Sequence, residues 1–148
     1  MTRRRSILTI GCAALAVACL AYLYDPPWIE HVTTGMRRWE ERPAGTRFRW
    51  TNGHASFFVP ADGKMLTVPM RAVFPDPNGG PVTVKVSVDD RWLADVVLAD
   101  PDAWERPRLP LPRRPTRRHF RRVDLRVSRV VPAGNYGVQT GEIAVERN

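Results

Sequence analysis

Hydrophobic and polar positions alternate with a period of two over most of the chain after residue 45. The clearest unit is PVTVKVSVDDRWLADVVLAD, residues 81–100, where valine occupies every second position from Val82 to Val88. Such alternation predicts strands with one buried and one solvated face. Asp89-Asp90 predicts the turn of a β-hairpin, because aspartate tolerates tight turns. In the returning strand Trp92 shares a face with Ala94, Val96 and Leu98, which predicts that it lies in the core.

Further short runs separated by turn residues extend this pattern to about eight strands. Asn52-Gly53 predicts a turn between two of them, and Pro69 predicts an edge strand or a bulge. Several short strands at spacings of roughly 8–15 residues are typical of a sandwich or barrel. We therefore predict an all-β fold, an antiparallel jelly-roll-like β-sandwich over residues 46–148. The remaining expected strands are residues 47–51, 55–60, 64–74, 104–112, 123–131 and 136–147.

The first 24 residues have a different pattern, a basic start followed by an uncharged apolar run. Residues 6–24 contain no charged side chain and are just long enough, as a helix, to span a hydrocarbon core of about 30 Å. Asp25-Pro26-Pro27 ends the helix. We expect a cytoplasmic basic tail at 1–5, a single transmembrane signal-anchor helix at 6–24 and a linker at 25–45. The domain that follows would then lie outside the cell membrane.

Two other fates of this segment remain open. Ala16-Val17-Ala18 matches the small-residue pattern before a signal-peptide cleavage site, so the chain could be secreted after cleavage near Ala18. Cys19 follows the same residues and could carry a lipid, as in a lipoprotein. The apolar run continues past Cys19, which favours the retained anchor. All three fates place the C-terminal domain outside the cytoplasm.

Composition narrows the chemistry of this domain. Both cysteines, Cys12 and Cys19, lie in the opening run, so the domain has neither a disulfide framework nor a cysteine ligand or nucleophile. The three histidines are far apart in sequence, without metal-ligand spacing, and no serine lies in a nucleophile motif. The paired aspartates fall at expected turns. We expect no catalytic residue, no metal and no cofactor, and therefore no enzyme.

The order of the segments FRWTNGHASFFVP, VTVKVSVDDRWLADVVL, WERPRLPLP, VDLRVSRVVPAG and YGVQTGEIAV resembles a known group of domains. It resembles the small jelly-roll β-sandwiches related to carbohydrate-binding and galactose-binding-like modules. In bacteria such domains occur on membrane anchors or at the C-terminus of membrane glycosyltransferases. The resemblance implies a cell-envelope module that binds glycan or lipid-linked sugar, or an accessory to a glycosyltransferase. The catalytic transmembrane part of such enzymes has no counterpart in this chain.

Two sets of side chains are candidates for binding. Trp50 and Trp104 could stack a sugar ring at the rim of the sandwich, although most tryptophans of a small sandwich fill its core. The second set is a basic run that could hold anionic lipid or an anionic polymer, or could serve as a charged loop that prevents edge pairing. Nucleic acid is not an expected partner outside the cytoplasm. A structural subunit that binds a membrane protein through a sheet edge is a further alternative. The basic run comprises Arg113, Arg114, Arg117, Arg118, Arg121 and Arg122.

Overall fold

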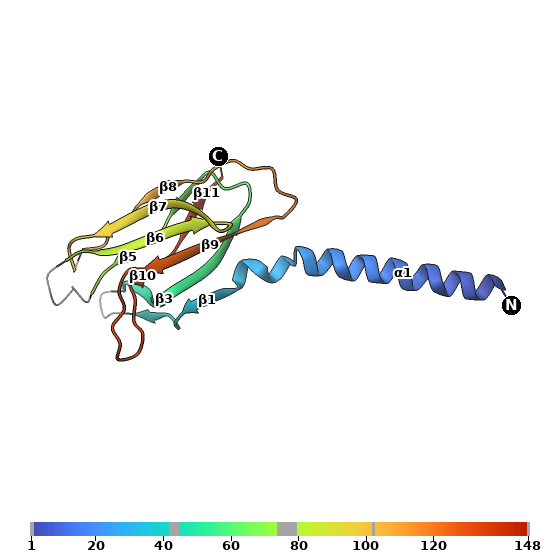
Figure 1. Ribbon diagram of the computed structural model, residues 1–148, viewed down its shortest axis with the longest axis horizontal. Coiled ribbons are helices and arrows are strands. Elements are labelled where there is room, and N and C mark those ends of the chain that lie inside the picture. Colours follow the sequence, from blue (N-terminus) through green and yellow to red (C-terminus); the bar gives the residue numbers. More distant parts are fainter. Residues whose placement is uncertain (1, 42–44, 74–79, 102, 148) are drawn as a thin grey trace.

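The computed structural model describes residues 2–41, 45–73, 80–101 and 103–147. A long helix, α1 (Thr2–Tyr24), extends away from a β-sandwich, and a short 3-10 helix, η1 (Pro27–His31), joins the two (Figure 1). By length and composition, the span Thr9–His31 is able to cross a membrane, and only 6% of its apolar window is buried. The sequence prediction of one N-terminal apolar helix before an all-β domain is confirmed.

The strands form two antiparallel sheets. The large sheet has the order β5-β10-β3-β9-β6-β7, with β1 and β2 paired to β3, and the small sheet has the order β11-β4-β8. The strands of the large sheet are β1 (Thr33–Met36), β2 (Glu40–Glu41), β3 (Arg47–Pro60), β5 (Met70–Arg71), β6 (Val82–Val88), β7 (Arg91–Leu98), β9 (Phe120–Val127) and β10 (Gln139–Thr140). The strands of the small sheet are β4 (Met65–Thr67), β8 (Arg108–Pro110) and β11 (Ala144–Glu146).

Strand β3 runs without interruption through Asn52-Gly53, so the turn predicted there is wrong. Its partner changes at this point, from β10 at Arg49 and Trp50 to β9 from His54 onward. Gly53 allows close packing instead of forming a turn. A Cβ on Gly53 would lie 3.0 Å from Cγ1 of Val130, which is the close approach that a glycine within a strand often marks.

Two of the expected strands pass from one sheet to the other, and they do so side by side. Residues 64–74 divide at Pro69 into β4 and β5, and residues 136–147 divide at Gly141 into β10 and β11. The N–H of Gly141 donates to the carbonyl of Pro69 at 3.0 Å. The proline therefore lies where the ladder of one sheet stops, which explains why it is tolerated inside an alternating pattern.

The core lies between the sheets and follows the alternation of the sequence. Val84, Val86 and Leu125 of the large sheet are fully buried, as is Leu66 of the small sheet. The hairpin of β6 and β7 is confirmed, and both residues of its turn have positive φ angles, 50° at Asp89 and 63° at Asp90. Two consecutive positive angles are the geometry of a two-residue hairpin turn, and aspartate accepts them.

Trp92 is not in the core, contrary to the sequence prediction. The β6–β7 register shifts between Val86 and Ser87: Val86 pairs with Ala94, whereas Ser87 pairs with Trp92. Leu93 is therefore an extra residue in β7, a β-bulge. Because side chains alternate with a period of two, one extra residue moves every side chain before it to the opposite face. Trp92 is 65% exposed as a result.

The segment expected to be a linker, residues 25–45, contributes to the sandwich. After η1, both β1 and β2 pair with β3, so the sheet begins before residue 46. Gly35 allows this pairing through a register shift between Thr34 and Met36, with a positive φ of 64°. Residues 28–41 are rich in charged and small residues without a clean alternation, and their pairing is set by β3 instead.

Candidate functional site

A row of polar side chains crosses the outer face of the large sheet on five adjacent strands. Thr34 of β1 pairs with Ser56 of β3, which pairs with Asp124 of β9. Asp124 also pairs with Ser87 of β6, and Ser87 pairs with Trp92 of β7. The register of the sheet therefore aligns Trp92 with hydroxyl and carboxylate groups. The bulge in β7 is what brings the indole into this row.

A second row lies beside the first and is mostly basic. His54, Arg126, Lys85 and Asp95 are consecutive partners on β3, β9, β6 and β7. The two rows border a shallow cavity of about 320 Å³ on the outer face. Its lining consists of His54, Lys85, Ser87, Asp90, Trp92, Arg122, Asp124 and Arg126.

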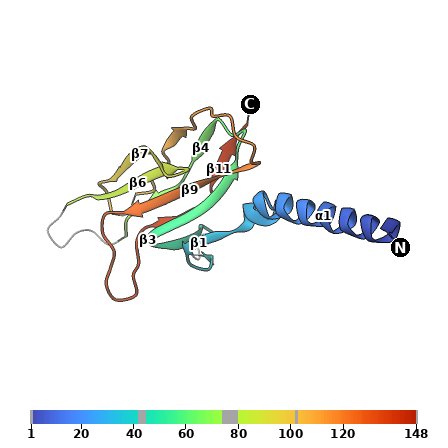
Figure 2. The ribbon, with the colours of Figure 1, turned by 45° about the vertical axis from the view of Figure 1, so that its right-hand side comes forward.

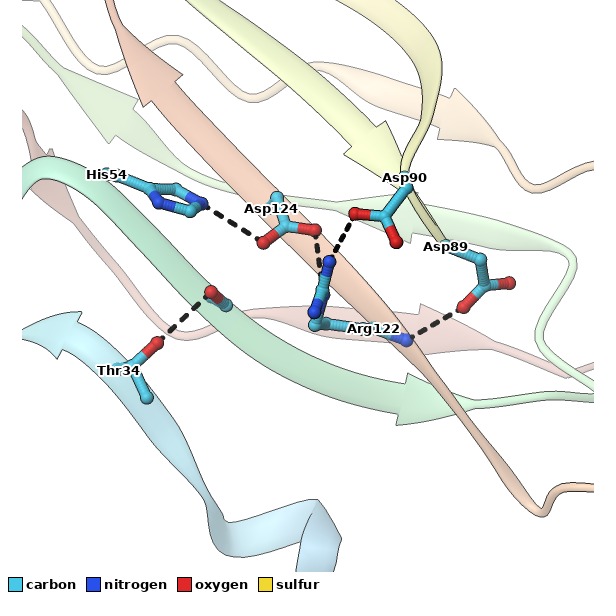
Figure 3. A network of polar contacts seen from close by, with 7 residues as sticks. Thr34, His54, Asp89, Asp90, Arg122 and Asp124 are labelled. Carbon is cyan, nitrogen blue, oxygen red and sulfur yellow. Dashed lines mark hydrogen bonds and ion pairs between the residues drawn. The ribbon is translucent and has the colours of Figure 1, made fainter.

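Asp124 is the centre of the hydrogen-bond network in this cavity (Figure 3). Its side chain is only 6% exposed, and it accepts Nε2–H of His54 at 3.1 Å and Nε–H of Arg122 at 3.0 Å. Burial by itself would raise the pKa of Asp124, but hydrogen bonds from His54, Ser56 and Arg122 together hold its pKa below the ordinary value. The carboxylate is therefore ionised at neutral pH and has fixed neighbours.

Arg122 links the cavity to the hairpin turn. Its guanidinium contacts Asp124 and Asp90, while its backbone N–H donates to Oδ1 of Asp89 at 3.1 Å. The hydrogen bond to Asp124 is the main reason that the pKa of Arg122 is raised. Because Arg122 is held from two sides, the hairpin turn and the cavity floor form one connected unit.

Trp92 forms one wall of the cavity and keeps its ring in solvent. Its Nε1–H donates to Oδ1 of Asp95 at 3.0 Å, which fixes the orientation of the indole. An aromatic face of this kind packs well against the C–H edges of a sugar ring. Hydroxyl groups of the same sugar would find charged donors and acceptors on the neighbouring strands. The arrangement is suited to binding a polar ring-shaped ligand.

The cavity does not have the geometry of an activated nucleophile. Ser56 is hydrogen-bonded to the Asp124 carboxylate and accepts the Thr34 hydroxyl at 3.1 Å, and the imidazole of His54 contacts the same carboxylate. A nucleophile would need to be hydrogen-bonded to the base instead. Within the described ranges, no group of three or more His, Cys, Asp or Glu side chains is placed to hold a metal ion.

Trp50, one of the two tryptophans proposed from the sequence, is buried, but it is not part of the hydrophobic core cluster between the sheets. It is 9% exposed and packs edge-on against Tyr136 at 5.1 Å and Phe48 at 6.5 Å between ring centroids. Its ring faces are therefore not available to stack a sugar. The alternation around residue 50 gives no clear inward face, since charged Arg49 and polar Thr51 flank it.

Trp104, the second proposed tryptophan, is half-buried at the opposite end of the sandwich from η1. The guanidinium of Arg71 lies over its ring at 5.4 Å from the centroid. The ring borders a separate cavity of about 400 Å³ whose lining includes Arg106 and Glu142. Trp104 therefore remains a candidate, but it does not belong to the cavity around Trp92.

The basic run divides into two environments. Arg113, Arg114, Arg117 and Arg118 are exposed in the loop before β9. Arg121 is only 3% exposed: it donates to Oδ2 of Asp89 at 2.8 Å and to the carbonyl of Pro112 at 2.7 Å. Arg121 points inward because it shares the face of Val123 and Leu125 on β9, so it is a structural residue and not part of a binding loop.

Sequence reasoning missed Trp92 and its neighbours. The alternation in WLADVVL predicts the correct faces from Ala94 to Leu98. Nothing in the sequence indicates that Leu93 is an extra residue. The polar row was partly visible in the sequence, because Ser87 alternates with Val86 and Val88, and Asp124 alternates with Val123 and Leu125. What the sequence lacked was the strand order, which aligns these side chains into one surface.

No family model matches the chain, and no curated protein matches it. Similar solved structures include the C-terminal CBM6 of LamC, a marine laminarinase of Zobellia galactanivorans, with a TM-score of 0.44 and 11% identity over 76% of this chain and 88% of that one. CsCBM6-3 of Clostridium stercorarium, solved with cellobiose, has a TM-score of 0.43 and 10% identity over 79% and 87%. The CBM51-2 and INT domains of Clostridium perfringens ZmpB have a TM-score of 0.37 and 14% identity over 76% and 28%.

Proposed function

We propose that this protein is a non-catalytic, membrane-tethered module that binds glycan in the cell envelope, outside the cytoplasm. The observation that carries the proposal is the exposed Trp92 ring beside the polar cavity of the large sheet. Free glycan and lipid-linked sugar, including the sugar substrate of a neighbouring glycosyltransferase, share the chemistry that this cavity would recognise.

The cavity combines an aromatic surface with polar groups that are already oriented. The indole is 65% exposed and is fixed by Asp95. Asp124 and Arg122 are fixed by each other and by their neighbours, so little side-chain entropy is lost when a ligand binds. A sugar needs both features, because it presents an apolar C–H face and a rim of hydroxyl groups.

The helix α1 supports the proposed membrane attachment. The helix is 23 residues long and lies away from the sandwich, with exposed apolar side chains such as Leu15 and Leu20. Exposed side chains of this kind are stable in lipid and costly in water. The basic start of the chain favours a cytoplasmic N-terminus, so the sandwich would lie outside.

A C-terminal alkaline phosphatase fusion tests this topology. The intact mass of the membrane-extracted chain distinguishes a retained, a lipidated and a cleaved N-terminus.

A glycan-binding screen of the full chain in detergent micelles tests the proposed function. We expect binding that persists in high salt and that falls about fivefold or more in Trp92→Ala, because stacking one aromatic face is worth about 1 kcal/mol or more. Trp28→Ala is the matched control, since Trp28 is also half-exposed but lies at η1. No glycan binding in the screen, or equal binding by the wild type and Trp92→Ala, would contradict the assignment.

One observation favours a second function, a protein-interaction subunit. β7 is the last strand of the large sheet in the described pairing, it is eight residues long, and Val97 on it is 54% exposed. A strand at a sheet edge can pair with a strand of another protein. A Val97→Lys variant that loses a membrane-protein partner in crosslinking, but keeps glycan binding, would support this second function.

A further inference from the structure

The end of the sandwich from which α1 extends is strongly basic. The loop between β8 and β9 lies at this end in both views of the ribbon (Figures 1 and 2). It presents four exposed arginines within six residues: Arg113, Arg114, Arg117 and Arg118. The loop therefore concentrates positive charge at the base of the domain, on the side of the helix.

Two contacts hold this loop against the end of α1. The backbone N–H of His119 donates to Oδ2 of Asp25 at 2.8 Å, and the guanidinium of Arg118 lies 4.7 Å from the ring centroid of Tyr24. Tyr24 is the last residue of α1. If α1 spans the bilayer, Arg118 lies within the headgroup layer, which is about 5–8 Å thick on each side of the hydrocarbon core.

Aromatic side chains mark the same level. Tyr22, Tyr24 and Trp28 are 52%, 54% and 50% exposed at the end of α1 and in η1. Tyrosine and tryptophan gather at the boundary between hydrocarbon and headgroups, where one part of the ring is apolar and the other is hydrated. These three rings place the boundary next to the arginine loop.

The carboxylates near this end already have partners other than the four loop arginines. Asp89 binds Arg121 and Asp90 binds Arg122, while Asp25 contacts His119. Asp62 lies 3.8 Å from Arg147. In the contacts of the described residues, none of the four loop arginines is paired with a carboxylate. Their charge is therefore available to an external anion.

A cavity beside the loop has room for such an anion. It measures about 590 Å³, and its lining includes Arg114, Arg118, His119 and Arg147. Among the described residues of the lining, Asp62 is the only one with a carboxylate, and it faces Arg147. Arginine binds phosphate through two parallel N–H groups, so two arginines around a cavity of this size suit a phosphodiester group.

We propose that the loop of residues 113–118 binds the phosphate groups of anionic phospholipids in the leaflet from which α1 emerges. The sandwich is then docked on the membrane by its base and does not swing freely about the end of α1. This inference uses residues separate from Trp92 and its cavity, so it stands or falls independently of glycan binding. Anionic headgroups are the favoured source of phosphate because the loop and the end of α1 are in contact.

The experiment uses the full chain in lipid nanodiscs. A fluorophore is attached at Thr116→Cys in a background in which Cys12 and Cys19 are replaced by alanine, and a quencher is attached to the lipid headgroup. In discs that contain phosphatidylglycerol we expect quenching at least about twofold stronger than in pure phosphatidylcholine, and a loss of this difference in high salt. Arg114→Gln/Arg118→Gln should remove the difference.

Arg38→Gln/Arg106→Gln is the matched control, because it removes the same charge from exposed residues near the start of β3, at the other end of the sandwich. It should leave the quenching unchanged. Equal quenching in the two kinds of disc would overturn the proposal. So would an equal loss in both double variants, because that would indicate net charge and not the loop. A glycan titration of the same samples reports on Trp92 separately.

Discussion

The carboxylate of Asp124 accepts the Nε–H of Arg122, two positions earlier on β9, at 3.0 Å. Both side chains stand on the outer face of the large sheet, where a lone buried carboxylate would be costly. Arg122 and His54 offset that cost, and their contacts fix the floor of the cavity beside Trp92. The stability of the sheet and the shape of the candidate site therefore depend on the same pair.

Asp124→Asn should lower the free energy of unfolding at pH 7 by about 1–3 kcal/mol. The reason is that a neutral amide replaces the charged carboxylate that accepts hydrogen bonds from Arg122 and His54. Chemical denaturation of the full chain in micelles, followed by tryptophan fluorescence, measures this difference. Ser87→Ala is the control, since Ser87 lies in the same row but on the neighbouring strand. An unchanged denaturation midpoint in Asp124→Asn would contradict the role of the carboxylate.

The same variant should change the dependence of stability on pH. The pKa of Asp124 is lower in the folded chain than in the unfolded chain, so its contribution is fully present above about pH 4 and is lost as pH falls through the folded pKa. The gap in unfolding free energy between wild type and Asp124→Asn should therefore narrow below about pH 4. A gap that stays constant from pH 7 to pH 3 would mean that the folded and unfolded pKa values are equal.

Trp50 and Trp92 should respond oppositely to replacement by alanine. Trp50→Ala should cost about 3–5 kcal/mol of unfolding free energy, because it leaves a cavity beside Phe48 and Tyr136. Trp92→Ala should change stability by less than about 1 kcal/mol, since the ring is mostly solvated. Denaturation of the two variants under identical conditions gives the comparison. A large loss of stability in Trp92→Ala would place this ring in the core.

The loss of stability on replacing Arg121 should depend on the size of the new side chain. Arg121→Ala should cost about 2–5 kcal/mol, because it opens a void on the inner face of β9 and also removes the ion pair with Asp89. Arg121→Met should cost clearly less, since it fills the void while Asp89, which is 45% exposed, returns to water. Arg113→Ala, in the exposed loop, should stay within about 0.5 kcal/mol of wild type. Equal costs for the alanine and methionine variants would contradict the packing role.

Alanine substitutions at Gly35 and Gly45 should distinguish the cost of a positive φ angle from the cost of a steric clash. Both have positive φ angles, 64° and 77°, but a Cβ on Gly35 would lie 1.9 Å from the carbonyl oxygen of His54, whereas a Cβ on Gly45 meets nothing within 4 Å. Gly45→Ala should cost about 1–2 kcal/mol through φ alone. Gly35→Ala should cost more and should loosen the β1–β3 pairing, which hydrogen exchange of β1 amides would show. Equal effects of the two variants would mean that β1 is not tightly paired.

The alternation of side chains was enough to predict the sandwich and the β6–β7 hairpin, and the uncharged run after the basic start predicted the apolar helix. The alternation gave wrong predictions where a single residue changes the local strand geometry. Leu93 adds a single position to β7 and thereby reverses the face of Trp92, and no propensity distinguishes a bulged leucine from a paired one. Asn52-Gly53 was interpreted as a turn because that dipeptide favours turns, yet it lies within β3, between the residues that pair with β10 and those that pair with β9.

The candidate site was less predictable than the fold for a related reason. Its side chains come from β3, β6, β7 and β9, which are distant in sequence and are aligned only by strand order and register. The arginine loop was visible in the sequence, but its contact with Tyr24 and Asp25 depends on tertiary packing. The burial of Arg121 depends on its position in β9, opposite the solvated Arg122.

The most direct test of the central claim is to titrate a glycan that binds in the screen into the ¹⁵N-labelled full chain and to follow the indole N–H signals by NMR. The tryptophans report separately once Trp92→Phe has assigned its signal. The account predicts that the Trp92 signal shifts with ligand, because the Trp92 side chain lines the cavity. A saturating titration that moves the Trp104 signal and leaves Trp92 unchanged would contradict the assignment of the site to the outer face of the large sheet.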